Sequence, residues 1–205
     1  MKNIPPKQIT KPQTFILESL SLEDERKNRL DGKLLFEALK IYRKRPKYYY
    51  FRTERELRCL AEEFRNSGYR YLHISCHGAE NLFQFTFNQM NFLVFADIFK
   101  EKLDNRRLFI SGCDLGNRQL ADAVFAQNGG MYSVIAPRKP IFFNQSVAFW
   151  TAFHYRMGTY TNDSMKKDDI TQELNELSKL FEVKMSYFWK NTQTNSVSFA
   201  DFPIK

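Results

Sequence analysis

The chain has 205 residues and a mass of 24.4 kDa, which suits one sizeable core and is too short for two comfortable domains. No apolar run reaches the roughly 18–20 residues of a membrane-spanning helix, and residues 1–12 lack the apolar core of a secretory signal. Its three cysteines do not suit a disulfide framework, and its net charge of +8 leaves contact with nucleic acid open.

Strand and helix patterns alternate along the chain, which is typical of an α/β fold whose mostly parallel sheet has helices on both faces. In chain order we predict strand 14–20, helix 34–42, strand 48–52, helix 53–67, strand 69–76, hairpin arm 82–87 with turn residues 88–91, helix 95–103, strand 107–112, helix 117–128, strand 131–136, helix 146–157 and helix 168–183. We expect one soluble, cytoplasmic domain over residues 1–205, with 1–12 flexible and 191–205 an uncertain tail.

Two predicted buried strands each end on a reactive side chain. The first delivers His77 followed by Gly78, and the second delivers Cys113. Parallel strands that end side by side would bring imidazole and thiol to one edge of the sheet, where a Cys–His dyad can form. The imidazole takes the proton of the thiol, and a helix that begins near Asn117 helps to stabilise the thiolate. The backbone N–H groups of Gly78 and Cys113 are candidates for an oxyanion hole.

The sequence around these residues resembles the caspase-like cysteine peptidases, in particular the bacterial CHAT group. The motifs are HISCHGAE at 73–80 and LFISGC at 108–113, and the match continues through 120–134 and 146–157. The family shows a strand ending in His-Gly, a hairpin, a short helix and a strand ending in a small residue and Cys. The resemblance therefore covers roughly residues 51–157.

The resemblance implies a caspase-like fold and a protein or peptide substrate. By it, His77 is the general base and acid, Cys113 the nucleophile and Gly78 an oxyanion donor. It implies no cofactor, a regulatory protein partner or activator, and a role in bacterial defence or signalling. The segment after the nucleophile departs from the family pattern because it begins with Asp114 rather than a small residue. We expect the Asp114 side chain to cap the next helix.

Specificity in such a fold comes from the loop after the strand that follows the nucleophile, here residues 137–144. This loop contains Arg138 and Lys139. Two cations at the substrate pocket predict an acidic substrate group by charge complementarity. A solvated turn is the alternative interpretation of the same loop.

The remaining histidines and cysteines predict no metal site. His73 and Cys76 lie on opposite faces of a strand because side chains alternate, so they cannot converge with His77 on one ion. We expect Cys59 and Cys76 to be core thiols.

Other polar residues have weaker claims on the site. Asp122 and Asp163 are candidates to orient His77, although caspase-like enzymes often use a backbone carbonyl instead. His154 falls in an aromatic helix and is expected to lie on its surface or to be hydrogen-bonded in the core.

Two other functions stay open at the level of sequence. One is an inactive caspase-like module that only binds a partner. The other is a nucleic-acid-binding adaptor, since the basic run 43–47 precedes three tyrosines at 48–50 and aromatic rings beside cations can stack on bases.

Overall fold

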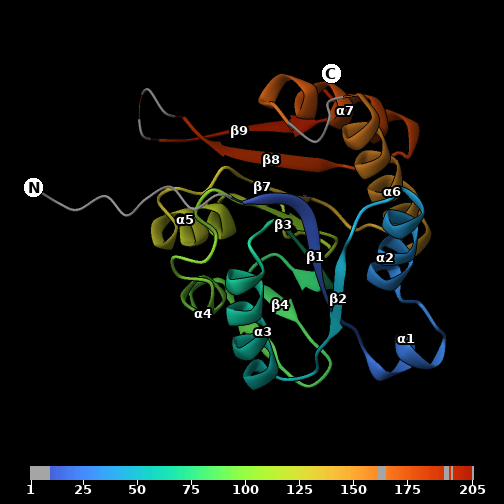
Figure 1. Cartoon of the computed structure of the whole chain (residues 1–205), viewed down its shortest axis with the longest axis vertical. Helices are drawn as coiled ribbons and strands as arrows, with labels where there is room; N and C mark the ends of the chain where they lie inside the picture. The colour runs from blue at the N-terminus through green and yellow to red at the C-terminus, as the bar shows by residue number, and fades with distance from the viewer. Residues whose placement is uncertain (1–9, 161–164, 192–193, 195, 205) are drawn as a thin grey trace, which may run out of the picture.

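A mixed sheet lies between two layers of helices in the computed structural model, which describes residues 10–160, 165–191, 194 and 196–204 (Figure 1). The strands are β1 (Lys11–Ser19), β2 (Lys47–Tyr50), β3 (Tyr69–Ala79), β4 (Leu82–Gln84), β5 (Gln89–Asn91), β6 (Arg107–Ile110), β7 (Ser133–Pro137), β8 (Met185–Lys190) and β9 (Val197–Phe202). The helices are α1 (Leu22–Arg26), α2 (Asp31–Ile41), α3 (Glu54–Ser67), α4 (Phe92–Ile98), α5 (Arg118–Gln127), α6 (Phe143–Tyr160) and α7 (Lys167–Leu180).

The strand order of the main sheet is β2-β1-β3-β6-β7-β8-β9. Strands β2, β1, β3, β6 and β7 run parallel, whereas β8 is antiparallel to β7 and β9 to β8. The short strands β4 and β5 form a hairpin on the end of β3. The predicted fold class, a mostly parallel sheet flanked by helices, is confirmed, because crossover helices between parallel strands must cover the faces of the sheet.

Local sequence signals explain where the helices begin and end, and α3 is the clearest case. The Thr53 side chain accepts a hydrogen bond from the Glu56 backbone, and the Glu56 side chain accepts one from the Thr53 backbone. Gly68 ends the helix in the left-handed conformation, with φ of 68°. This capping box and glycine stop were both predicted, and each satisfies backbone groups that the helix itself leaves unpaired.

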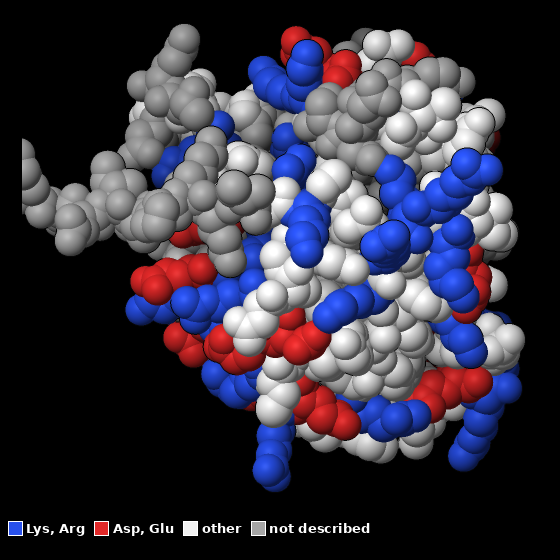
Figure 2. Space-filling model, in the orientation of Figure 1, with Lys and Arg blue, Asp and Glu red and all other residues white. Residues whose placement is uncertain are grey.

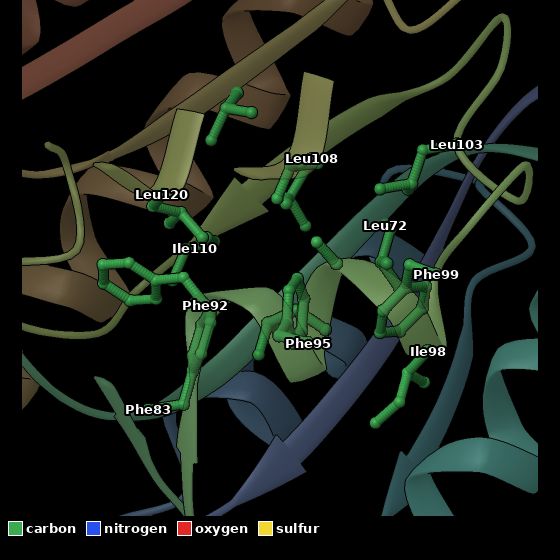
Figure 3. Close-up of a cluster of buried hydrophobic side chains, with 14 of the residues drawn as sticks. Leu72, Phe83, Phe92, Phe95, Ile98, Phe99, Leu103, Leu108, Ile110 and Leu120 are labelled. Carbon is green, nitrogen blue, oxygen red and sulfur yellow. The ribbon is translucent and has the colours of Figure 1, made fainter. Parts of the chain in front are cut away.

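Two apolar cores lie on opposite faces of the sheet. Helices α3, α4 and α5 pack on one side, which we call the α3 face, and α2, α6 and α7 pack on the other, which we call the α2 face (Figure 1). The α3 face is filled by rings such as Phe83, Phe95 and Phe99, packed with aliphatic side chains from β3 and β6 (Figure 3). Trp150 and Phe109 lie in the core of the α2 face.

Several elements differ from the prediction. Helix α1 and strand β8 were not predicted, and the tail assigned no structure contains β9. Helix α4 begins at Phe92, earlier than expected, because the Asn91 side chain caps it. The expected turn residues include β5, which pairs with β4. None of the helices in the described residues is long and apolar enough to cross a membrane.

Candidate active site

The topology brings His77 and Cys113 to one place. Strands β3 and β6 are parallel neighbours in which Ile74 pairs with Ile110. His77 lies three positions after Ile74, and Cys113 lies three positions after Ile110. Both side chains line one pocket of about 40 Å³ at the carboxyl ends of the strands. The other lining residues are Asp31, Cys76, Ser111, Ile141, Phe143 and Ser146.

Gly78 lies directly against the backbone that follows β6. A Cβ atom placed on Gly78 would be 2.5 Å from the carbonyl oxygen of Cys113 and 2.5 Å from the side chain of Leu115. Real Cβ atoms do not approach backbone this closely, so only glycine allows the two segments to meet. The contact with the loop that contains Cys113 therefore requires glycine at position 78.

Asp24 is a candidate functional residue that sequence reasoning missed. Its Oδ2 atom lies 2.8 Å from Nε2 of His77. The side chain is held in α1 by Ser21, whose hydroxyl accepts from the Asp24 backbone at 3.1 Å and donates to the Asp24 carboxylate. Arg29 also contacts this carboxylate, at 3.3 Å.

The charge on Asp24 sets the tautomer of His77. Burial opposes ionisation of Asp24, but hydrogen bonds from Ser21 and His77 outweigh burial, and the pKa of Asp24 is lowered. An ionised carboxylate only accepts hydrogen bonds, so Nε2 of His77 must be the donor. Nδ1 is then left with the lone pair in the neutral ring, free to accept a proton from a thiol.

The two aspartates proposed as orienting residues do not take this place. Asp122 pairs with Arg118, 2.8 Å away on the exposed side of α5, and Asp163 lies outside the described residues. The available signal was Ser21 three positions before Asp24, a spacing close to that of a capping box. Because α1 has only five residues, no apolar period drew attention to it.

Ile141 covers the thiol of Cys113. The backbone N–H of Ile141 lies 3.4 Å from Sγ of Cys113, and the carbonyl oxygen of the same residue lies 3.6 Å from it. The edge of the His77 ring meets Phe143, with ring centroids 5.8 Å apart. Ile141 and Phe143 narrow the pocket, whose volume of about 40 Å³ is too small for a peptide.

The two cations predicted to bind substrate do not line this pocket. Arg138 lies in a separate hollow and its Nε atom is 3.8 Å from Asp201. Lys139 is exposed. The structure therefore brings together His77 and Cys113 but leaves both cations outside their pocket.

The expected role of Asp114 is wrong. Asn117, not Asp114, caps α5 by accepting a hydrogen bond from the backbone of Leu120 at 3.0 Å. Asp114 instead has a positive φ of 59°, a turn conformation that Asp adopts more readily than most residues.

The remaining thiols and histidines occupy different environments. Cys76 is buried, and burial followed by the charge of Asp31 raises the pKa of its thiol. Cys59 is exposed, which corrects its assignment as a core thiol. His154 is buried but its Nε2 atom has no hydrogen-bond partner, and burial lowers its pKa to about 3. It is therefore a neutral core residue rather than a satisfied one.

Metal-ligating side chains do not cluster in the part of the chain that the structure describes. No group of three or more His, Cys, Asp or Glu residues there is arranged to hold an ion. The ionisable groups that line the pocket are the thiols of Cys76 and Cys113, the imidazole of His77 and the carboxyl group of Asp31.

Comparison with known proteins identifies the fold. No protein-family model and no curated protein matches the chain. The structure of pro-sf-caspase-1 matches with a TM-score of 0.54 at 12% identity, covering 88% of this chain and 88% of that one. Caspase-1 from Spodoptera frugiperda matches with a TM-score of 0.49 at 15% identity, covering 85% of this chain and 82% of that one. The chain has a caspase-like fold.

Proposed function

We propose that this protein is a cysteine endopeptidase of the CHAT type, with Cys113 as nucleophile and His77 as general base and acid. The observation that carries the proposal is that both side chains line one pocket at the carboxyl edge of the sheet. A caspase-like fold makes protease-type chemistry the natural use of that pair, and the proposal needs no cofactor.

Each residue has one task in the proposed reaction. Nδ1 of His77 takes the proton of the Cys113 thiol, while Asp24 holds the ring through Nε2 and stabilises the imidazolium. The thiolate attacks the carbonyl carbon of the substrate and forms a carbon–sulfur bond. His77 then gives its proton to the amine as the carbon–nitrogen bond breaks. Water hydrolyses the remaining thioester, which releases the acid and restores the thiol.

The oxyanion of the tetrahedral intermediate needs donors close to the thiol. The backbone N–H groups of Gly78 and Cys113 are the candidates, since the two residues are in direct contact. Backbone donors fixed in place before the reaction are effective because they need not reorganise.

Access to Cys113 requires residues 138–142 to move. Both backbone groups of Ile141 now lie within 3.6 Å of the sulfur, and the free volume cannot hold a peptide. We therefore propose a latent enzyme. The resemblance in sequence, rather than this geometry, is the basis for proposing that a regulatory protein partner activates it in the cytoplasm, in a bacterial defence or signalling system.

The nucleic-acid adaptor is not favoured, because the tyrosines of β2 already make contacts within the chain. Tyr49 stacks on Phe15 with centroids 5.1 Å apart, and the hydroxyls of Tyr48 and Tyr50 donate to Glu18 and Glu25. Basic side chains are spread over the visible face with acidic ones among them (Figure 2).

Alkylation of the intact protein with iodoacetamide tests the proposal, because the exposed thiol of Cys59 is an internal reference. We expect Cys113 to react faster than Cys59 at pH 6, where an unassisted thiol is almost entirely protonated. The variant His77→Ala should reduce the Cys113 rate by about 100-fold and leave Cys59 unchanged. Equal, slow alkylation of both residues, with and without His77, would favour the inactive binding module.

Asp24→Asn tests the positioning role of Asp24. An amide can bind His77 as an acceptor or a donor, so it no longer fixes the tautomer or stabilises the imidazolium. We expect the Cys113 rate to fall at least about 10-fold at pH 6 and its pH profile to move to higher pH. The neighbouring exposed variant Glu23→Gln is the matched control. A lower melting temperature with an unchanged pH profile would mean that Asp24 is only structural.

A further inference from the structure

A buried carboxylate without a cationic partner lines the pocket of Cys113. Asp31 is 6% exposed and lies beside His77 and the thiol. Its partners are two hydroxyl groups, from Ser75 and, at 2.7 Å, from Ser146. Among the residues that the structure describes, no Lys, Arg or His forms an ion pair with it. Charged groups buried in proteins are usually paired. Asp31 can therefore pair with a cationic group of a ligand that enters the pocket.

A second carboxyl group, Glu18, lies next to Asp31 and holds its proton more tightly than an exposed glutamate. Both carboxyl groups contact Ser75, and Glu18 is completely buried. Burial, and then the charge of Asp31, raises the pKa of Glu18 to about 7. Asp31 also stands in the first turn of α2, where the helix dipole favours a negative charge.

The surrounding space suits a long side chain with a charged end. The pocket adjoins a second hollow of about 330 Å³, with which it shares Asp31 and Phe143. Much of the wall of this second hollow is apolar, from Leu34, Val147 and Ala148. Arg29 lines it too, but its guanidinium group is held by Asp24. Lys and Arg bury their methylene stems against such walls while the charged head reaches a polar group.

We infer that this pocket selects a substrate with a Lys or Arg side chain next to the cleaved bond, and that Asp31 binds its charged head. The inference rests on the proposed peptidase function. It names the class of peptide cut, a basic one. The sequence predicted the opposite preference, an acidic substrate group bound by Arg138 and Lys139. These two residues lie outside the pocket.

Peptidyl chloromethyl ketones test the pocket without requiring turnover. The Cys113 thiolate displaces chloride and forms a thioether, so the labelling rate, followed by mass spectrometry of the full-length protein, reports how well the adjacent side chain is bound. Three probes differ only at that residue, which is arginine, citrulline or aspartate. Citrulline keeps the shape of arginine and removes its charge, so the ratio of their rates isolates the electrostatic contribution.

We expect the arginine probe to label Cys113 at least about 30-fold faster than citrulline, and aspartate to be slowest. In Asp31→Asn the ratio of the arginine rate to the citrulline rate should fall toward one, and this ratio is read independently of any change in the overall reactivity of Cys113. Asp97→Asn, an exposed carboxylate on α4, is the matched control and should keep the ratio.

The outcomes separate the inference from the proposed function. Equal labelling by arginine and citrulline, or faster labelling by aspartate, overturns the inference even if iodoacetamide reveals an activated Cys113. Any movement of the Ile141 loop that the probes require is common to all three, so the ratios of their rates report the binding of the variable side chain. A slow, His77-independent reaction with iodoacetamide overturns the proposed function itself. If Asp31→Asn fails to fold, the three-probe comparison on the unmodified protein still decides.

Discussion

The two faces of the sheet are built from the same strands, yet only one of them carries the candidate site. On β1 and β3, Leu17 and Ile74 point to the α3 face and enter an apolar core. Their immediate neighbours, Glu18 and Ser75, point to the α2 face, where both contact residues at the start of α2. Because side chains alternate along a strand, consecutive residues point to opposite faces, one into the apolar core and the next toward the candidate site.

The difference shows where buried polar residues gather in this fold. The α3 face follows the usual pattern of apolar residues inside, and its rings pack against one another. The α2 face begins in the same way but becomes polar toward the carboxyl ends of the strands, at Glu18, Ser75 and Ser111. Local departure from an apolar pattern marks the site, because buried polar groups destabilise a fold unless they have partners.

The largest expected effect comes from the α3 face. Phe95 is completely buried and stacks on Phe83 with centroids 4.3 Å apart (Figure 3). Phe95→Ala should lower the free energy of unfolding by about 3–5 kcal/mol, since it removes apolar contact and leaves a cavity. Urea denaturation measures the loss. At a temperature where the variant is folded, the ratio of Cys113 to Cys59 alkylation should stay unchanged, and a lower ratio would contradict the separation of the two faces.

The second effect belongs to the α2 face and depends on pH. The pKa of Glu18 is raised by burial from 4.5 to about 7, so the folded chain keeps a proton that the unfolded chain has already lost. Stability due to this group is therefore present below pH 4.5 and lost as pH rises to 7. By linkage the loss amounts to about 3 kcal/mol.

Glu18→Gln isolates this contribution because the amide does not titrate. The unfolding free energy of the variant minus that of the unmodified protein should increase by up to about 3 kcal/mol between pH 4.5 and 7.5. Urea denaturation across this range measures it, with the exposed Glu37→Gln on α2 as the control. A difference that does not vary with pH would mean that Glu18 is ionised throughout this range, which would contradict the raised pKa of this group.

Much of the fold follows from local sequence, and the exceptions have physical reasons. The capping box at Thr53 and the stop at Gly68 fix α3 within the chain itself. Strand β9 has alternating polar and apolar residues and lies at the edge of the sheet, so only its pairing with β8 defines it. The sequence of β9 alone gives a weak strand signal, and the pairing with β8 that stabilises it forms only in the folded chain, which is why this region was assigned no structure.

The site divides in the same way. His77 and Cys113 could be predicted because both follow buried strands, and adjacent parallel strands end at a common edge. Asp24 and Asp31 could not, since they lie on α1 and α2, outside the strand motifs, and only tertiary contacts bring Asp24 to His77 and Asp31 to the pocket. Spacing thus predicts the proposed nucleophile and base, whereas the carboxylates proposed to position the base and to bind the substrate can be found only in the folded chain.

The smallest expected effect concerns the junction between Cys113 and α5. Asn117 caps this helix and also donates to the backbone oxygens of Glu80 and Asp114, each at 2.9 Å. Asn117→Ala should therefore lower the unfolding free energy by about 1 kcal/mol. Asp114 has a positive φ that glycine adopts without strain, so Asp114→Gly should change this quantity by no more than about 0.5 kcal/mol. If urea denaturation showed Asp114→Gly to be the more destabilising of the two changes, Asp114 would be the cap of α5. Its charge would then lie against the helix rather than in the turn beside the thiol.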